Sequence, residues 1–332
     1  MRIAFDAHGG DHAPVAVVEG IRLAAKEWPD VTYILIGRDP SILPNDLANV
    51  IFKHVTEQIE PEDEPVKAVR RKKDSSMVVG CQMVRKGEAD AFISGGNTGA
   101  LMAAGLFHTG RIKGVDRPAL APIFPTLSGR GTLVLDVGAN PEAKPQHLYQ
   151  YARMGRIYAE KVLGFEAPRI GLLNIGTEEG KGTELTKEAF SLLEKESSLR
   201  FIGNVEARDI LFDACDVLVC DGFSGNILLK NTEGVAKAIF ERLKEEFMRS
   251  LSTKIAAAIL KPGLKRFKNS MDYKEHGGAP LLGLMGPVIK AHGSSDARAF
   301  FNAARQARLF IDRGVIPRII EDLSPKKGED NE

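Results

Sequence analysis

The sequence predicts an α/β protein with a mainly parallel sheet. Apolar, strand-like runs alternate with segments of helical pattern along most of the chain, which favours parallel pairing. Six of the runs end in a short glycine-rich turn that carries polar side chains. In an open α/β sheet such turns lie at the carboxyl ends of the strands, so we expect one polar site suited to anions. The turns are residues 6–11, 94–99, 136–140, 174–182, 221–226 and 292–296.

Each element is placed by its apolar pattern and its flanking turn residues. Pro14 suits the first turn of the first helix. Pro122 and Pro125 interrupt the run 119–126, which predicts an edge or irregular strand. The acidic loop 57–65 is interpreted as a solvated linker, and the basic residues 70–73 as a solvated helix end or a surface for an acidic protein. The expected strands are 3–6, 33–37, 50–55, 89–94, 132–137, 169–175, 200–203, 216–221 and runs within 281–290, and the expected helices are 14–28, 147–163 and 184–194.

From Ser224 the pattern is almost wholly helical as far as Phe267. We expect a helical hairpin at about 228–268, broken at Pro262 and Gly263, with an apolar face among basic residues. Such a hairpin suits an anionic bilayer surface, and the alternative is a dimer-core helix. The candidate membrane contacts are Leu251, Ile255, Ile259 and Leu264. The whole is predicted to be one large domain over 1–323, or two intimately joined lobes, with a charged, frayed tail at 324–332.

Composition limits the class of protein. The 45 basic and 44 acidic residues nearly cancel, so no global field would gather nucleic acid. Three cysteines are too few and too scattered for a disulfide framework or a structural zinc site, which fits a reducing cytosol. Met1 leads directly into an apolar strand, so no secretory leader is expected, and no uninterrupted apolar stretch is long enough for a spanning helix.

The chain lacks the usual nucleotide fingerprints. No G-x-G-x-x-G follows a strand, and the lysine of 176–182 is flanked by glycines instead of standing at P-loop spacing. His8, Asp11 and His12 lie close together, but helix capping explains them without a metal. We therefore expect neither a cofactor nor a metal.

Two of the turns have the layout of an anion site. The backbone of Gly95, Gly96, Asn97 and Thr98 lies between an apolar strand and a small-residue helix, where amides can hold phosphate. His292, Ser294 and Ser295 offer donors at another helix start. The alternatives are a tight turn whose glycines permit close packing, and a plain N-cap.

The remaining turns supply single candidates. Lys181 is a cation framed by glycines, and it is either a phosphate ligand or a surface lysine. Asn226 can donate to an oxyanion, and Asp221 can orient a neighbour. Asp136 and Asn140 repeat that pattern, with Asx-turns as the alternative for all four side chains.

Together these motifs resemble the phosphate acyltransferase family of bacterial phospholipid synthesis, which moves an acyl chain from acyl carrier protein to inorganic phosphate. The resemblance covers residues 1 to 318 and rests on residues 3–14, 93–101, 136–140, 173–178, 221–226 and 291–296. The family usually has methionine where His8 stands, so no chemistry is assigned to that histidine.

The resemblance implies a three-layer α/β/α fold akin to phosphotransacetylases and isocitrate-type dehydrogenases. It further implies a cytoplasmic homodimer that attaches reversibly to the inner membrane face through the hairpin. Its partners would be acyl carrier protein, phosphate and a membrane-embedded glycerol-3-phosphate acyltransferase, which receives the acyl phosphate. Among the residues it carries over, Lys181 and Asn226 are the strongest candidates.

The chemistry expected is mainly positioning, because phosphate is already an anionic nucleophile and a thiolate leaves readily. The amides of 95–98 and the hydroxyls of Ser294 and Ser295 would hold phosphate, and Lys181 would neutralise it. Asn226 or His292 would donate to the oxyanion, and His292 could protonate the thiolate. The cysteines are not expected to be nucleophiles. The rival functions are a short-chain phosphotransacetylase acting on acetyl coenzyme A and a non-catalytic membrane-surface scaffold.

Overall fold

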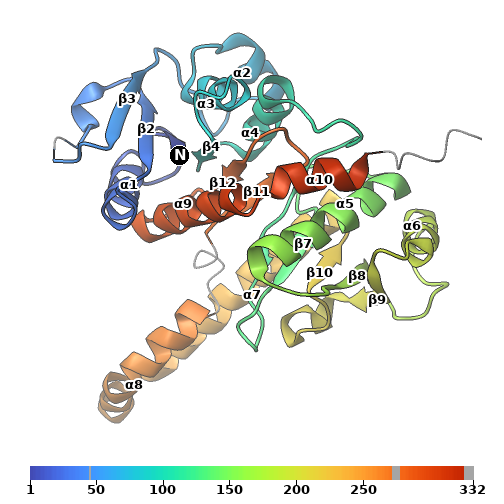
Figure 1. The fold of residues 1–332 in the computed structure, drawn as a ribbon. Coiled ribbons are helices and arrows are strands. Elements are labelled where there is room, and N and C mark those ends of the chain that lie inside the picture. Colours follow the sequence, from blue (N-terminus) through green and yellow to red (C-terminus); the bar gives the residue numbers. More distant parts are fainter. Residues whose placement is uncertain (45, 271–276, 325–332) are drawn as a thin grey trace, which may run out of the picture.

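The computed structural model describes residues 1–44, 46–270 and 277–324, and its strands form two sheets (Figure 1). The larger sheet has the order β3-β2-β1-β4-β12-β11-β5, and the smaller has the order β6-β7-β10-β8-β9. The larger sheet consists of β1 (Arg2–Asp6), β2 (Thr32–Gly37), β3 (Val50–His54), β4 (Ala91–Ser94), β5 (Ala119–Leu120), β11 (Ala279–Leu282) and β12 (Val288–Lys290). The smaller consists of β6 (Ile123–Phe124), β7 (Thr132–Leu135), β8 (Arg169–Asn174), β9 (Arg200–Glu206) and β10 (Val217–Val219). Apart from Ser324, the expected tail lies outside the described residues.

Helices cover both faces of the larger sheet. The helices α1 (Val15–Glu27) and α9 (Ala297–Asp312) pack together on one face, and α2 (Pro65–Arg71), α3 (Ser76–Arg85) and α4 (Thr98–Ala104) lie on the other (Figure 1). Strand alternation explains this arrangement. Ile3 and Phe5 of β1 belong to the core under α1 and α9, whereas Ala4 belongs to the core under α3.

The smaller sheet is covered in the same way. The helices α5 (Pro145–Tyr158) and α6 (Glu184–Lys195) pack on one face, and the first turns of α7 (Gly222–Met248) pack on the other. The last helix, α10 (Val315–Leu323), packs on α5. The expected three-layer α/β/α arrangement with mainly parallel strands is confirmed.

The proline-containing run 119–126 joins the two sheets. It forms β5 at the edge of the larger sheet and β6 at the edge of the smaller, so the prediction of edge strands is confirmed. At the crossing, Ala121 N donates to Pro280 O at 3.0 Å, and Val134 N donates to Pro122 O at 3.0 Å. One core cluster contains Phe92 of the larger sheet and Leu218 of the smaller, so the sheets share buried side chains.

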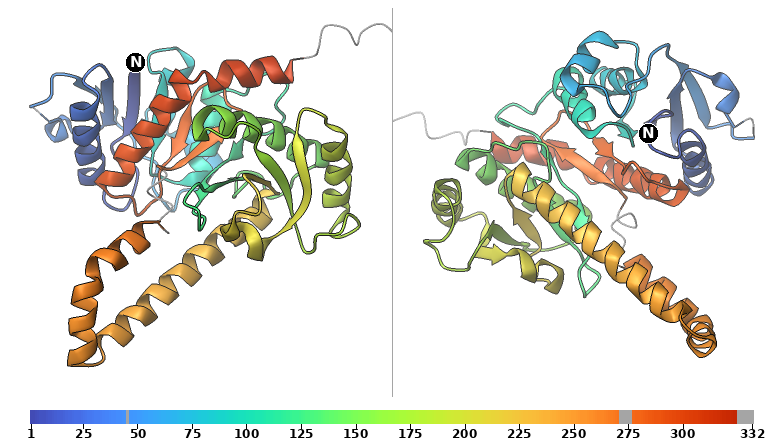
Figure 2. Two further views of the ribbon diagram at one scale, coloured as in Figure 1. Left: turned by 60° about the horizontal axis from the view of Figure 1, so that its bottom comes forward. Right: turned by 180° about the vertical axis from the view of Figure 1, so that it is seen from behind.

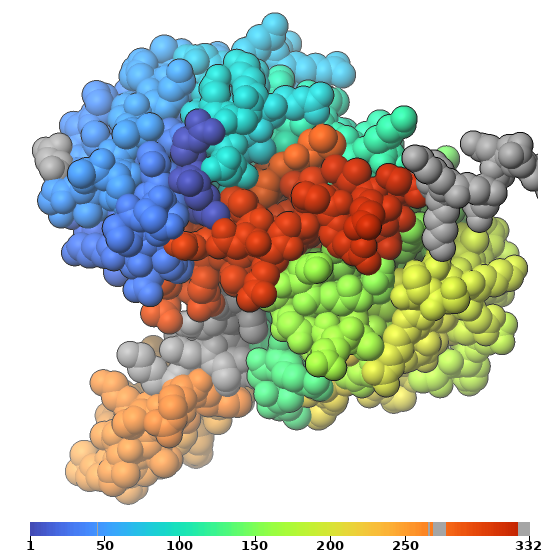
Figure 3. All heavy atoms as spheres, in the orientation of Figure 1, coloured from blue at the N-terminus to red at the C-terminus, as the bar shows by residue number. Residues whose placement is uncertain are grey.

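The hairpin consists of α7 and α8 (Leu251–Ser270), and beyond the first turns of α7 it stands away from the body of the molecule (Figures 2 and 3). Its turn is at Ser250, where Ser250 Oγ accepts from Thr253 N at 3.2 Å and Thr253 Oγ1 accepts from Ser250 N at 3.0 Å. This reciprocal cap starts α8. None of the helices in the described part of the chain combines the length and the apolar character needed to cross a bilayer.

The expected break at Pro262 and Gly263 is wrong, because α8 runs through both residues. An interior proline costs a helix about 3 kcal/mol, through one lost hydrogen bond and a clash with the preceding turn. Packing against α7 opposes that cost. Beyond the proline, the ring of Phe267 lies 5.7 Å from that of Phe240, measured between centroids.

Candidate active site

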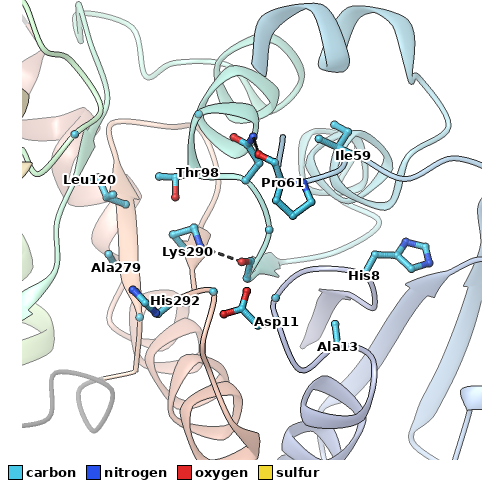
Figure 4. A pocket seen from close by; sticks show the side chains of 18 of the residues that line it. His8, Asp11, Ala13, Ile59, Pro61, Thr98, Leu120, Ala279, Lys290 and His292 are labelled. Carbon is cyan, nitrogen blue, oxygen red and sulfur yellow. Dashed lines mark hydrogen bonds between the residues drawn. The ribbon is translucent and has the colours of Figure 1, made fainter. Parts of the chain in front are cut away.

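A cleft of about 960 Å³ lies between the two sheets (Figure 4). One wall, the turn wall, is made by the turns that follow β1, β4 and β12 in the larger sheet. The chain leaves β1 for β2 on one side, while β4 pairs with β1 on the other, and such a switch in strand order is where α/β proteins bind ligands. The opposite wall, the apolar wall, includes Leu120, Pro122, Ile123, Val137 and Leu229.

The turn wall is packed backbone against backbone. A Cβ added to Gly9 would lie 2.7 Å from the amide nitrogen of Gly96 and 2.8 Å from that of Gly95. Asp11 N donates to Gly293 O at 2.7 Å, which joins the first turn to the third. Close packing therefore accounts for part of the glycine pattern, and it brings three turns that are distant in sequence to one place.

A buried carboxylate that the sequence analysis did not single out orders these turns. Asp6 accepts hydrogen bonds from Ser94 Oγ at 2.7 Å and Ser76 Oγ at 2.6 Å, and from His8 N at 3.0 Å. Ser94 Oγ in turn accepts from Gly96 N at 3.1 Å. The available signal was an aspartate that ends a buried strand and begins a glycine turn.

Gly95, Gly96, Asn97 and Thr98 all line the cleft, as the sequence analysis expected of a phosphate site. The side chain of Asn97 is used within the fold: Oδ1 caps α4 through Ala100 N at 3.0 Å, and Nδ2 donates to Pro61 O at 2.9 Å. This bond holds the loop 57–64 at the cleft, where Ile59, Glu60 and Pro61 are part of the lining. Ile59 is buried, so the interpretation of that loop as a solvated linker is wrong for this residue, whereas Glu60 and Pro61 are exposed.

Asn226 reaches the cleft because α7 packs unusually close to β7. A Cβ added to Gly225 would lie 1.9 Å from Asp136 O, so only glycine fits there. The next residue, Asn226, lies beside Gly138, whose added Cβ would be 3.6 Å from Asn226 Cγ. The turns 136–140 and 221–226 thus meet, and of their polar candidates Asn226 is the one that lines the cleft.

The other three candidates in these turns have structural partners. The Asp136 carboxylate, whose pKa is raised by burial, accepts from Leu120 N at 3.0 Å and from Asn140 N at 2.6 Å. Asn140 Nδ2 donates to Tyr151 Oη at 2.9 Å. Asp221 caps α7 by accepting from Ser224 N at 2.8 Å. None of the three is part of the cleft lining. The carboxylates of Asp136 and Asp221 accept from backbone amides of their own turns, as the Asx-turn alternative expects, whereas the Asn140 side chain donates to Pro118 O and Tyr151 Oη instead.

Lys181 is likewise outside the cleft lining. Its half-exposed side chain places Nζ 4.0 Å from Glu178 Oε1, and its carbonyl accepts from Asn174 Nδ2 at 3.0 Å. The carboxyl end of β8, from which this loop starts, lies on the same sheet edge as the turns after β7 and β10. Its role as a phosphate ligand stays a prediction.

His292 lines the cleft, and its Nδ1 lies 2.9 Å from Ser294 Oγ. Its Nε2 is 3.9 Å from Oε1 of Glu233, a residue of α7 that the sequence analysis did not identify. The cap of α9 is Asp296, which accepts from Ala299 N at 2.9 Å; it is neither Ser294 nor Ser295. Ser295 is buried, and neither serine is part of the lining.

Lys290 is a third residue, after Asp6 and Glu233, that the sequence analysis missed. It ends β12, its side chain is buried in the cleft wall, and Nζ donates to Gly95 O at 3.1 Å and to Ala291 O (Figure 4). Burial lowers the pKa of Lys290 to about 8. A lysine at the end of an apolar strand, directly before a glycine turn, was the signal.

The cysteines are unsuited to nucleophilic catalysis, as expected. All three are buried, and burial raises the pKa of both Cys81 and Cys215 to about 12, so the thiolate form is suppressed. Within the residues that the structure describes, no three His, Cys, Asp or Glu side chains are grouped as a metal site would require.

Comparison with solved structures supports the fold. A EutD phosphotransacetylase from Staphylococcus aureus aligns with a TM-score of 0.56 and 17% identity, and the alignment covers 93% of each chain. A branched-chain phosphotransacylase from Enterococcus faecalis aligns with a TM-score of 0.58 and 14% identity, over 94% of this chain and 99% of the other. At such identities the similarity shows the fold alone.

Sequence comparison shows the family. The model of a family described as "Fatty acid synthesis protein" matches residues 1–318. A phosphate acyltransferase of Brevibacillus brevis is 60% identical over 327 residues, which is 97% of each chain. A phosphate acyltransferase of Bacillus cytotoxicus is 56% identical over 322 residues, covering 96% of this chain and 97% of the other. Together with the cleft between the sheets, these similarities show that the chain belongs to the phosphate acyltransferase family.

Proposed function

We propose that this chain takes an acyl group from the thioester of acyl carrier protein and transfers it to inorganic phosphate in the cleft between the sheets. Acyl transfer to phosphate for phospholipid synthesis is the activity of its family. The observation that supports the finer proposal is the contrast between the walls. The turn wall offers amides and charged groups, and the apolar wall offers the hydrocarbon of Leu120, Ile123 and Val137 to an acyl chain, beside the polar side chains of α7.

The turn wall is suited to hold the nucleophile. Phosphate needs no activation by a strong base, so the gain comes from fixing it against the thioester carbonyl, worth on the order of 7 kcal/mol at ideal alignment. We assign the backbone of residues 95–98 to this task, because all four residues line the cleft. Lys181, Ser294 and Ser295 remain proposed phosphate ligands. None of the three lines the cleft in this structure, so their side chains would have to move to reach the phosphate.

Asn226 is the proposed oxyanion donor. It enters the cleft from the first turn of α7, on the wall opposite the turns that would hold phosphate. Such a donor contributes roughly 3 kcal/mol to transition-state stabilisation. His292, on the turn wall, is the proposed proton donor to the departing thiolate.

The donor and the roles of Asn226 and Lys181 can be tested together. Purified protein is supplied with phosphate and either a long-chain acyl carrier protein thioester, the matching coenzyme A thioester or acetyl coenzyme A, and acyl phosphate is measured. We expect the carrier-protein thioester to have the largest kcat/KM, and Asn226→Ala to lower kcat by about 100-fold or more without lowering Tm.

Other outcomes would change the assignment. A preference for acetyl coenzyme A would favour the short-chain alternative. Unchanged turnover in Asn226→Ala or Lys181→Ala would remove that residue from the chemistry. Membership in an enzyme family argues against the alternative of a non-catalytic scaffold. If the protein were only a scaffold, no acyl phosphate would form with any of the three thioesters.

The hairpin supports a second part of the proposal, which is peripheral attachment to the inner face of the cytoplasmic membrane. In α8, Leu251, Ile255 and Ile259 have exposed fractions of 77%, 56% and 74%, and Leu264 is partly buried. Lys254 and Lys261 are exposed on the same helix. An apolar face flanked by cations binds anionic lipid surfaces, where a membrane-embedded glycerol-3-phosphate acyltransferase could receive the acyl phosphate.

A homodimer is also part of the proposal, and its interface would cover some of the exposed apolar side chains. Leu127, Ile175 and Phe212 have exposed fractions of 68%, 81% and 65%. Sedimentation analysis across a concentration series would measure the subunit stoichiometry. A monomer at micromolar concentration would contradict this part without affecting the catalytic proposal.

A further inference from the structure

We propose that Lys290 is a cation of the cleft wall that binds inorganic phosphate, a role that rests on the proposed function of the same site. The residue is neither in a glycine turn nor exposed. Its assignment follows from its position, its donors and the charges around it.

The position of Lys290 is fixed by the sheet. In the parallel pairing of β12 with β4, Lys290 lies in register with Ser94, the last residue before the turn 95–98. The lysine therefore ends its strand between two turns of the turn wall, 94–99 and 292–296. In the view of Figure 4 its side chain lies at the cleft wall among labelled residues of both turns, and the carboxylate of Asp11 is near enough to act on its charge.

Two hydrogen bonds orient the ammonium group of Lys290 and leave one of its N–H donors unused by the described residues. An ammonium group has three N–H donors. Two of them go to the carbonyls of Gly95 and Ala291, which fixes the direction of the side chain. The third donor remains for a ligand in the cleft. Because the Gly95 carbonyl belongs to the proposed phosphate turn, an anion on that turn would lie beside the ammonium group.

Within the part of the chain that the structure describes, no carboxylate is bonded to the Lys290 ammonium group. The charged groups that face Lys290 are the carboxylates of Asp6 and Asp11, which act against the effect of burial. Asp6 is already engaged by Ser76, Ser94 and His8, and among the described residues Lys290 forms no salt bridge. A buried charge without a bonded counter-ion is costly unless a ligand supplies one. Phosphate would supply it.

Other cations at the cleft are less suited to this role. Arg38 donates to Gln58 Oε1 at 2.9 Å, so part of its guanidinium is used within the fold. Lys230 comes from α7, on the side of the apolar wall. Lys290 is the cationic lining residue buried at the junction of two turns that the sequence patterns associate with phosphate.

The test compares the wild type with Lys290→Met, which keeps the approximate length of the side chain and removes its charge. We expect the KM for phosphate to rise at least tenfold, with the KM for the acyl donor within twofold of wild type. Independently of turnover, inorganic phosphate should raise the Tm of the wild type and leave that of Lys290→Met unchanged. Lys187→Met, at an exposed lysine of α6 paired with Glu184, is the matched control and should behave as the wild type.

The outcomes separate the two proposals. A wild type without any acyl-phosphate formation would overturn the proposed function. An active wild type, with Lys290→Met showing the normal KM for phosphate and the normal phosphate-induced rise in Tm, would overturn the role of Lys290 alone. If Lys290→Met fails to fold, the proposal is tested on the wild type by the rate at which reductive methylation modifies Lys290. Phosphate should slow modification of Lys290 at least fivefold and not that of Lys187, and equal rates at Lys290 with and without phosphate would overturn the proposal.

Discussion

The two ends of α7 have opposite surroundings. Its first turn lies against the backbone of residues 136–140, so close that Gly222 and Gly225 leave no room for side chains. Farther along, Val235, Ile239 and Met248 have exposed fractions of 50%, 52% and 55%. At the first end, packing dictates the residue type, whereas at the second end these apolar residues are only about half covered within the described chain. One helix therefore links the candidate active site to the surface proposed to meet the membrane.

The largest effect is expected at the packed end. In Gly225→Ala the new Cβ would lie 1.9 Å from Asp136 O, a backbone atom that cannot move without disturbing β7. We expect the free energy of unfolding to fall by about 3 kcal/mol or more, measured by urea denaturation.

The same helix provides the control for this prediction. A Cβ at Gly234 meets no atom within 4 Å, so Gly234→Ala should stabilise the helix by up to about 1 kcal/mol. Equal stability of the Gly225→Ala variant and the wild type would show that α7 does not pack on β7 as described.

The next effect is expected at the exposed end of the hairpin. Leu251→Glu combined with Ile259→Glu removes two apolar contacts, each worth about 1.5–3 kcal/mol when buried, and adds charges that anionic lipids repel. We expect binding to anionic vesicles to weaken at least tenfold in a flotation assay, while turnover with soluble substrates changes less than twofold.

Ser191→Glu combined with Ser197→Glu adds the same charge at exposed positions far along the chain from the hairpin, and it should bind vesicles nearly as well as the wild type. Unchanged vesicle binding by the hairpin variant would leave the dimer-core alternative for α8.

A smaller effect concerns the pH dependence of stability at the turn wall. Burial lowers the pKa of Lys290 from 10.5 to about 8, against the opposing effects of Asp6 and Asp11. Between these two values the unfolded chain holds more protons than the folded one, so the contribution of Lys290 to the free energy of unfolding rises with pH.

Between pH 7.5 and 9.5, we therefore expect the wild type to gain about 2 kcal/mol relative to Lys290→Met, measured by urea denaturation at both pH values. A constant difference between the two proteins would mean that Lys290 is better solvated than its position in the cleft wall suggests.

The smallest effect is expected at the turn of the hairpin. Ser250→Ala removes the acceptor for Thr253 N, which should cost the first turn of α8 about 1 kcal/mol. Because the hairpin stands apart from the body, hydrogen exchange should become faster at the amides of residues 251–254 with little change in global Tm. Exchange rates equal to the wild type would show that the cap adds nothing to the start of α8.

Much of the fold could be predicted from the sequence, because alternating apolar runs and glycine turns report local structure. Pro122 and Pro125 even indicated where the edge strands lie. The turn of the hairpin could not be predicted in the same way. Pro262 is the stronger local signal, yet packing against α7 overrides it, and the modest cap at Ser250 sets the turn.

The candidate site was predictable where the cleft-lining residues lie in a recognisable turn, as with residues 95–98 and Asn226. It was not predictable where a side chain acts through residues distant in sequence. Asp6 and Lys290 each end a strand next to a turn of their own, but only the pairing of β1, β4 and β12 brings them to the turn that follows β4. Glu233 reaches His292 because α7 crosses the cleft edge, which no local pattern reveals.

The hydrocarbon of Leu120, Ile123, Val137 and Leu229 has a consequence for the fate of the proposed product, an acyl phosphate. An acyl phosphate is a mixed anhydride, and any water beside it is a competing nucleophile. Side chains that offer water no hydrogen bonds keep solvent scarce on the side where the acyl chain would lie. The same surface that accommodates the fatty chain would then protect the anhydride from hydrolysis until it leaves the protein.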